Sequence, residues 1–99
     1  ESDNSTSGKE VSLLSIKASG NILLITTRPG AASLVAARID KSIMRGESES
    51  LLGTVAGDDT IMVLHRENQR LNGVKELDKL FIGAADLYAV TNKRKVGKK

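Results

Sequence analysis

Short apolar runs alternate with polar breaks along the chain, and the spacing of the apolar residues changes from one run to the next. Two runs rich in Leu, Ile, Val and Thr cover residues 11–17 and 22–28, and the letters ASGN between them have the composition of a turn. We expect a β-hairpin here. The second run is nearly continuous, which favours a strand in the middle of a sheet or one covered on both faces.

A helical pattern follows Pro29, a residue that suits the first turn of a helix because its missing N–H has no intrahelical partner there. Val35, Ile39 and Ile43 recur at every fourth position, with several alanines beside them. They form one apolar stripe that can pack on a sheet. The small alanines also allow the start of the helix to approach either a strand or a ligand, and the pattern leaves both possibilities open.

The second half of the chain repeats this order. Residues 45–50 are polar and predict a loop, and the β-prone runs 51–56 and 60–65 are separated only by GDD, which predicts a second hairpin. Apolar residues then return at helical spacing and predict a helix over residues 69–82, at Leu71, Val74, Leu77 and Phe81. The predicted fold is α+β, in the order ββαββα, with a four-stranded, mainly antiparallel sheet and two helices on one face.

The two ends of the chain differ from this central part. Residues 1–10 are Ser-rich and almost free of apolar side chains, so we expect the remnant of a flexible linker before a domain at 11–83. The formal charge of +3 arises from the last nine residues, which carry five Lys or Arg and no acid. We expect residues 84–99 to form a solvated basic tail, although such a tail can also attract phosphates.

The composition excludes several kinds of chemistry. With no Cys and a single His, His65, the chain has no thiolate, disulfide or zinc-binding set and no nucleophilic triad. Phosphate-loop and dinucleotide motifs are missing, and one Tyr and one Phe do not form a stacking surface for bases. No apolar run approaches the roughly 18 residues that span a bilayer. We therefore expect a cytoplasmic protein without a cofactor, a membrane segment or enzymatic activity.

The letters AGDDT place two carboxylates, Asp58 and Asp59, between the two strands of the second hairpin. Neighbouring side chains in a tight turn point in different directions, so the pair suits two separate partners better than one shared proton. Gly and Asp are also the residues that turns prefer, and a metal ion would need more oxygen ligands than the sequence places nearby. Asp40 is a further acid that is compatible with the same pocket. An ordinary turn and a site that holds a cation both remain open.

The segment TTRPGAASLVAARID followed by LLGTVAGDDTIMVLHR resembles the C-terminal domain of the bacterial arginine repressor family. The resemblance covers most of residues 11–81 and centres on GTVAGDDTI, residues 53–61. It implies a regulatory domain that forms trimers, which pair face to face into hexamers. It also implies that L-arginine binds as effector at the interface between trimers.

The resemblance implies that carboxylates matching Asp58 and Asp59 contact the ligand, including its guanidinium from the opposing trimer. Such pairing suits a planar guanidinium, which donates parallel N–H bonds. Backbone groups in the turn and the helix N-terminus are expected to hold the amino-acid end. The implied ligand-binding residues are Ala32, Ser33, Asp40, Ala56, Gly57, Asp58 and Asp59. Ser33 stands where the family often has Gln or His, and the segment 41–52 is longer than the usual link.

In this family operator DNA is read by an N-terminal winged helix-turn-helix, and nothing before Val11 has the pattern of one. We expect this chain not to read operator DNA by itself. Two functions remain: an arginine-responsive assembly domain of a transcription regulator of arginine metabolism, or a constitutive oligomerisation scaffold on the same fold that has lost its effector.

Overall fold

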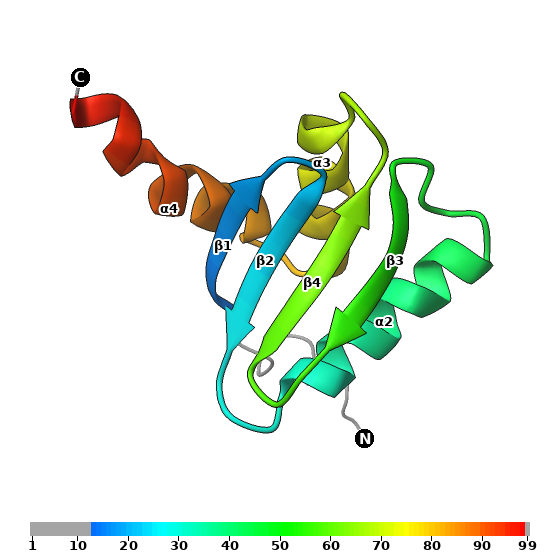
Figure 1. Cartoon of the computed structure of the whole chain (residues 1–99). Coiled ribbons are helices and arrows are strands. Elements are labelled where there is room, and N and C mark those ends of the chain that lie inside the picture. The colour runs from blue at the N-terminus through cyan, green and yellow to red at the C-terminus, as the bar shows by residue number, and fades with distance from the viewer. Residues whose placement is uncertain (1–12, 99) are drawn as a thin grey trace.

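A computed structural model describes residues 13–98 of the chain, with side chains for residues 13–92. Its elements, shown in Figure 1, are β1 (Leu13–Ser19), β2 (Ile22–Thr27), α2 (Ala32–Met44), β3 (Leu51–Ala56), β4 (Thr60–His65), α3 (Arg70–Leu80) and α4 (Ala84–Lys98). The predicted α+β fold is confirmed, and one helix is added to its end. The linker predicted at residues 1–10 lies outside the described residues.

The four strands form one sheet in the order β1-β2-β4-β3, and every neighbouring pair is antiparallel. Both predicted hairpins are confirmed, because β1 pairs with β2 and β3 pairs with β4. The two hairpins join through β2 and β4, where Ile25 lies opposite Ile61. The apolar β2 is therefore an interior strand, as its nearly continuous run of hydrophobic residues predicts.

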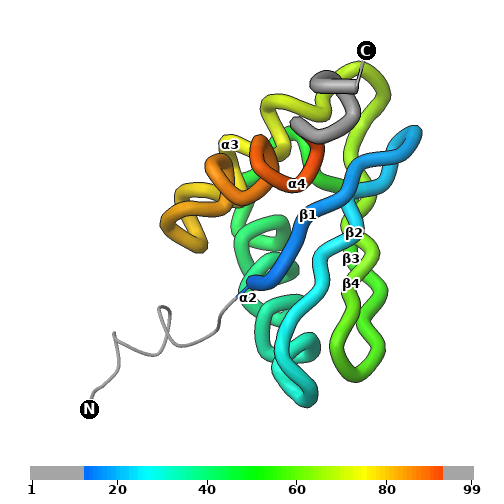
Figure 2. The backbone as a smooth tube through the Cα atoms, turned by 90° about the vertical axis from the view of Figure 1, so that its left-hand side faces the viewer, coloured from blue at the N-terminus to red at the C-terminus, as the bar shows by residue number. Residues whose placement is uncertain are grey.

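Figure 2 shows α2, α3 and α4 on the same side of the sheet. Alternate residues of each strand point toward these helices, and one stripe of each helix packs back on the sheet. Val35 and Ile39 of the predicted α2 stripe are fully buried. The other fully buried core side chains include Ile16, Leu23, Ile25, Ile61, Val63 and Leu77. Within the described residues no helix covers the opposite face of the sheet.

Helix α3 approaches the sheet closely at Gly73. A Cβ atom built on this residue would lie 3.0 Å from Leu51 Cδ2 and 3.7 Å from the Cβ of His65. A larger side chain would push α3 away from the end of β4. The glycine that weakens the helix in isolation thus permits its tertiary packing.

Helix α4 is the main difference from the sequence prediction, which placed only a basic tail after residue 83. Its first turn is anchored from α3, because Asp78 Oδ1 accepts the backbone N–H of Gly83 (3.2 Å) and of Ala85 (2.9 Å). Ala84 is buried, and Leu87 and Tyr88 pack against the core. The start of the predicted tail is therefore part of the folded core.

Farther along, α4 lies against the edge strand β1. The Thr91 hydroxyl accepts the N–H of Ile16 (3.3 Å), and the Asn92 amide bonds the N–H of Ala18 (3.3 Å) and the carbonyl of Ile16 (2.9 Å). Unpaired backbone groups on an edge strand invite pairing with other chains. Side chains of α4 occupy three of these groups on β1.

Candidate functional site

The predicted acidic turn connects β3 to β4 at one end of the sheet. Its hairpin is closed by the N–H of Gly57, which donates to the carbonyl of Thr60 (2.7 Å). The hydroxyl of Thr60 also donates to Asp59 Oδ1 (3.0 Å). Asp58 and Asp59 are both exposed, as are Ala56 and Gly57 before them. Two carboxylates therefore face solvent from a short, well-defined turn.

The turn is fastened to the segment before α2 through its main chain. The carbonyl of Asp58 accepts the N–H of Gly30 (3.1 Å) and of Ala32 (3.3 Å), and the carbonyl of Asp59 accepts the N–H of Thr27 (2.7 Å). Gly30 has φ 84°, in the left-handed region that glycine adopts without strain. Because backbone atoms make these attachments, they do not occupy the carboxylates. Apart from the bond that Asp59 Oδ1 accepts from Thr60, the carboxylate oxygens are available for other partners.

These bonds bring the acidic turn to the N-terminus of α2. Ala31, the N-cap, makes no side-chain capping bond, and the N–H of Ala32 is instead satisfied by Asp58. Ala32 is fully buried, while Ser33 beside it is exposed in the first helical turn. In Figure 1 the turn and the start of α2 meet at one end of the domain. Six of the seven predicted site residues lie there: Ala32, Ser33, Ala56, Gly57, Asp58 and Asp59.

The seventh residue, Asp40, lies elsewhere on α2. It is eight positions beyond Ala32, which corresponds to about 12 Å along the helix axis. Asp40 is half-buried, and its Oδ1 accepts a hydrogen bond from the hydroxyl of Thr54 on β3 (2.8 Å). The structure thus places Asp40 against the edge strand and not beside the acidic turn. The sequence analysis did not single out Thr54, which orients this carboxylate.

The described part of the chain contains no group of three or more His, Cys, Asp and Glu residues arranged to hold a metal ion. Within the same residues, no helix has both the length and the apolar character needed to cross a membrane.

Comparison with known proteins identifies the family. Residues 10–77 match the model described as "Arginine repressor, C-terminal domain". An arginine repressor of Bacteroides fragilis is 46% identical over 69 residues, which are 70% of this chain and 41% of that protein. An arginine repressor of Aeromonas hydrophila is 33% identical over 79 residues, 80% of this chain and 45% of the relative.

A third relative, the arginine repressor of Alkaliphilus metalliredigens, is 40% identical over 65 residues, which are 66% of this chain and 41% of that protein. The chain therefore spans less than half the length of these relatives. The family match contains the acidic turn and both elements to which it is attached, and it ends before α4. On this evidence the chain belongs to the arginine repressor family and corresponds to its C-terminal domain.

Proposed function

We propose that this chain is the effector-binding and assembly domain of a transcription regulator of arginine metabolism, with L-arginine as the effector. One structural observation carries the proposal: the acidic turn is held to α2 by backbone bonds, so that Asp58 and Asp59 keep exposed carboxylates. The named relatives support the same interpretation, because each is an arginine repressor.

The charges near the turn complement those of arginine. A guanidinium group donates several N–H bonds in one plane, and ionised carboxylates are its strongest acceptors. We assign this role to Asp58 and Asp59. The first turn of α2, at Ala32 and Ser33, suits the carboxylate of the ligand, because a helix N-terminus carries partial positive charge. The N–H of Ala32 already donates to the carbonyl of Asp58, so this charge and the next N–H groups would act on the ligand. Backbone groups of Ala56 and Gly57 complete the proposed set.

Asp40 is the member of this proposed set that lies farthest from the acidic turn along α2. Thr54 holds one oxygen of its carboxylate at 2.8 Å, which fixes the orientation of the side chain. The second carboxylate oxygen can then accept a hydrogen bond from the ligand or from a water that contacts it. Its distance along α2 gives Asp40 a smaller expected effect on affinity than either acid of the turn.

The uncovered face of the sheet supports self-association. Met62 lies between Leu24 on one side and Val55 on the other, so the three side chains form an apolar row across β2, β4 and β3. Met62 is 37% exposed and Val55 is 59% exposed. Contiguous apolar side chains on an open face are typical of an interface. We assign this face to assembly with other copies of the chain, as trimers that pair into hexamers.

Arginine binding and assembly are linked in this proposal. A ligand held between subunits stabilises the assembled state by mass action, and assembly in turn raises the affinity for the ligand. Operator DNA would be read by a winged-helix domain outside this chain, in the cytoplasm. A hexamer then places several weakly binding DNA-binding domains on one operator. Once one domain has bound, the others are at a high effective concentration, which raises the affinity of the hexamer for the operator.

Sedimentation velocity of the chain with and without L-arginine tests the proposal. We expect a larger assembly or a lower dissociation constant with arginine, and a smaller response to L-citrulline, which lacks the guanidinium charge. A monomer under both conditions would contradict the proposed function.

The constitutive scaffold is the second candidate, because the apolar face alone can drive association. Isothermal titration calorimetry separates the two. Saturable heat with arginine supports the effector domain. An assembly that forms without arginine and gives no heat with it supports the scaffold.

A further inference from the structure

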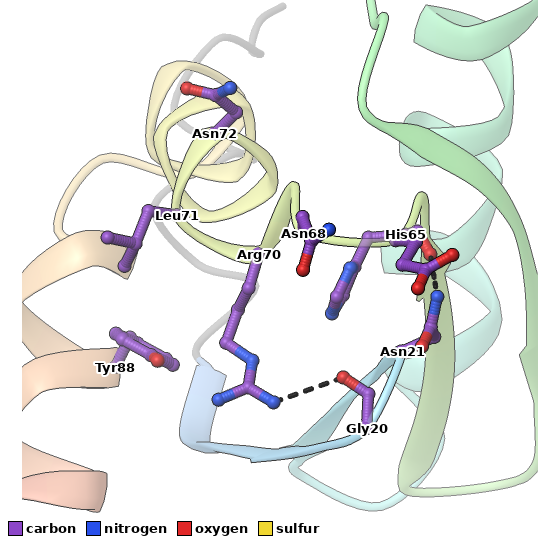
Figure 3. A pocket seen from close by; sticks show the side chains of 9 residues that line it. Gly20, Asn21, His65, Asn68, Arg70, Leu71, Asn72 and Tyr88 are labelled. Carbon is purple, nitrogen blue, oxygen red and sulfur yellow. Dashed lines mark hydrogen bonds between the residues drawn. The ribbon is translucent and has the colours of Figure 1, made fainter.

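A second candidate site lies at the opposite end of β4 from the acidic turn. An open cavity of about 660 Å³ is lined there by the β1–β2 turn, the end of β4, the first turn of α3 and the side chain of Tyr88 from α4. Figure 3 shows side chains from all four of these segments around one space. The family match ends at residue 77, so this cavity is completed by a helix outside it.

His65 contributes a buried nitrogen to this cavity. The residue is 2% exposed, and its Nδ1 lies 2.8 Å from the carbonyl oxygen of Arg66. A carbonyl only accepts hydrogen bonds, so Nδ1 carries a hydrogen, and in that neutral tautomer Nε2 is an acceptor. Among the described residues Nε2 has no hydrogen-bond partner. Figure 3 shows the ring extending between Asn68 and Asn21 into the cavity.

Arg70 contributes a second unpaired atom from a different element. One terminal nitrogen of its guanidinium donates to the carbonyl of Gly20 (3.0 Å), which orients the group across the cavity. Its Nε is buried and has no partner within the described part of the chain. Buried polar atoms without partners are uncommon and costly. Here an acceptor, His65 Nε2, and a donor, Arg70 Nε, both belong to residues that line one cavity and both lack partners among the described residues. Each atom has almost no solvent-accessible surface, so a ligand reaches it when the side chains over it move aside.

The N-terminus of α3 adds further donors at the same place. Its N-cap residue, Gln69, makes no capping bond, and its first turn contains no acid. The Gln69 side chain instead accepts a hydrogen bond from Asn72 (2.6 Å). The first N–H groups of a helix have no intrahelical partner and carry partial positive charge. With Arg70 they favour an oxyanion.

We propose that this cavity binds a small ligand that presents an oxyanion to Arg70 Nε and the start of α3, and an N–H or O–H donor to His65 Nε2. The lining contains one full cation, Arg70, and one acid, Glu67, so its charge suits a zwitterion such as a free α-amino acid. Leu71 and Tyr88 provide surface for the remainder of the ligand. Hydrogen phosphate has the same pair of groups, an oxyanion and an O–H.

NMR tests this proposal directly, because His65 is the only histidine of the chain and its ring nitrogens need no further assignment. The uniformly ¹⁵N-labelled full chain is titrated separately with glycine, inorganic phosphate and acetate. We expect glycine or phosphate to shift the signals of His65 Nε2 and Arg70 Nε in a saturable way. Acetate, which has an oxyanion but no donor at neutral pH, should bind at least about 10-fold more weakly, because it leaves Nε2 unpaired.

Arg70→Lys keeps the positive charge but removes the guanidinium nitrogens, so it should weaken binding about 10-fold or more. Arg45→Lys is the matched control, because Arg45 ends α2 and does not line the cavity. Its affinity should equal that of wild type. Backbone amide spectra of both variants establish that they are folded.

The separate titrations with glycine and phosphate also distinguish the two kinds of ligand. Saturation by glycine alone indicates an amino acid, and saturation by phosphate alone indicates a phosphate-bearing ligand. The proposal is overturned if neither probe gives a saturable shift at His65, if acetate binds as tightly as both, or if Arg70→Lys binds the probes as well as wild type.

Discussion

Asp58→Asn separates the proposed ligand-binding role of the acidic turn from its structural role. The substitution removes a negative charge and leaves the shape of the side chain nearly unchanged. The carbonyl of Asp58, which accepts the N–H groups of Gly30 and Ala32, is unaffected. Because the side chain is exposed, the free energy of unfolding should stay within about 0.5 kcal/mol of wild type.

The expected loss of arginine affinity follows from the hydrogen bond that is weakened. A bond to an ionised group contributes about 1.5–3 kcal/mol, and each 1.4 kcal/mol corresponds to about tenfold in the dissociation constant. Asp58→Asn should therefore weaken arginine binding by about 10- to 150-fold. Asp59→Asn should weaken arginine binding to a similar extent. It should leave the turn intact, because the amide oxygen of the new side chain can still accept the Thr60 hydroxyl.

Isothermal titration calorimetry with L-arginine measures this loss, and thermal unfolding measured by circular dichroism monitors the fold. Glu47→Gln is the control, because Glu47 is an exposed acid between α2 and β3 and its removal changes the net charge by the same amount. Unchanged arginine affinity in Asp58→Asn would refute the assignment. An equal loss in Glu47→Gln would also refute it, because the effect would then be one of net charge.

Three further substitutions test other parts of the structure. Val55→Asp puts a charge on the apolar face of the sheet, where Val55 is 59% exposed, so sedimentation should show weaker self-association with little change in melting temperature. Thr54→Val leaves Asp40 without its 2.8 Å donor and should cost about 1–3 kcal/mol in urea unfolding, and a cost near zero would contradict that contact. Leu77→Ala truncates a fully buried side chain and should lower the free energy of unfolding by about 2–5 kcal/mol. A loss of less than about 0.5 kcal/mol, as is usual for a surface residue, would contradict the observed packing.

Local patterns in the sequence were sufficient to predict the sheet and two helices. The residues of β2 alternate between buried and half-buried positions, and Val35 and Ile39 of α2 recur at the spacing of a helical stripe. Each pattern depends on neighbours within a few positions, so the sequence contains the information directly. The pairing of the two hairpins through β2 and β4 follows from the apolar character of both strands.

Helix α4 was missed because its position depends on distant contacts. Val90 is 64% exposed, and the basic residues at the end of the chain gave the segment the composition of a tail. The stabilising contacts are the bonds from Asp78 at its start and those that Thr91 and Asn92 make with β1, some 75 positions away. No periodicity within residues 84–99 indicates such partners.

The candidate site shows the same division between local and tertiary information. The letters GDD predicted both the turn and its two acids, whereas the attachment to α2 uses backbone carbonyls, which every residue type has. Asp40 was expected to face the same pocket because it lies beside the Ala-rich stripe of the first helix and because the family resemblance implies it. The sequence could not show that Thr54 holds it against β3.

Strand β4 separates the acidic turn from the His65 cavity. The turn precedes Thr60 and the cavity begins at His65, so the six residues of the strand place the two sites about 20 Å apart. A ligand as small as an amino acid cannot contact both. The two sites also favour opposite charges, since one presents carboxylates and the other presents a guanidinium beside a helix N-terminus. L-arginine also carries the α-ammonium and α-carboxylate groups that the His65 cavity is proposed to hold. The variants Asp58→Asn and Arg70→Lys therefore assign any arginine binding to one site or the other.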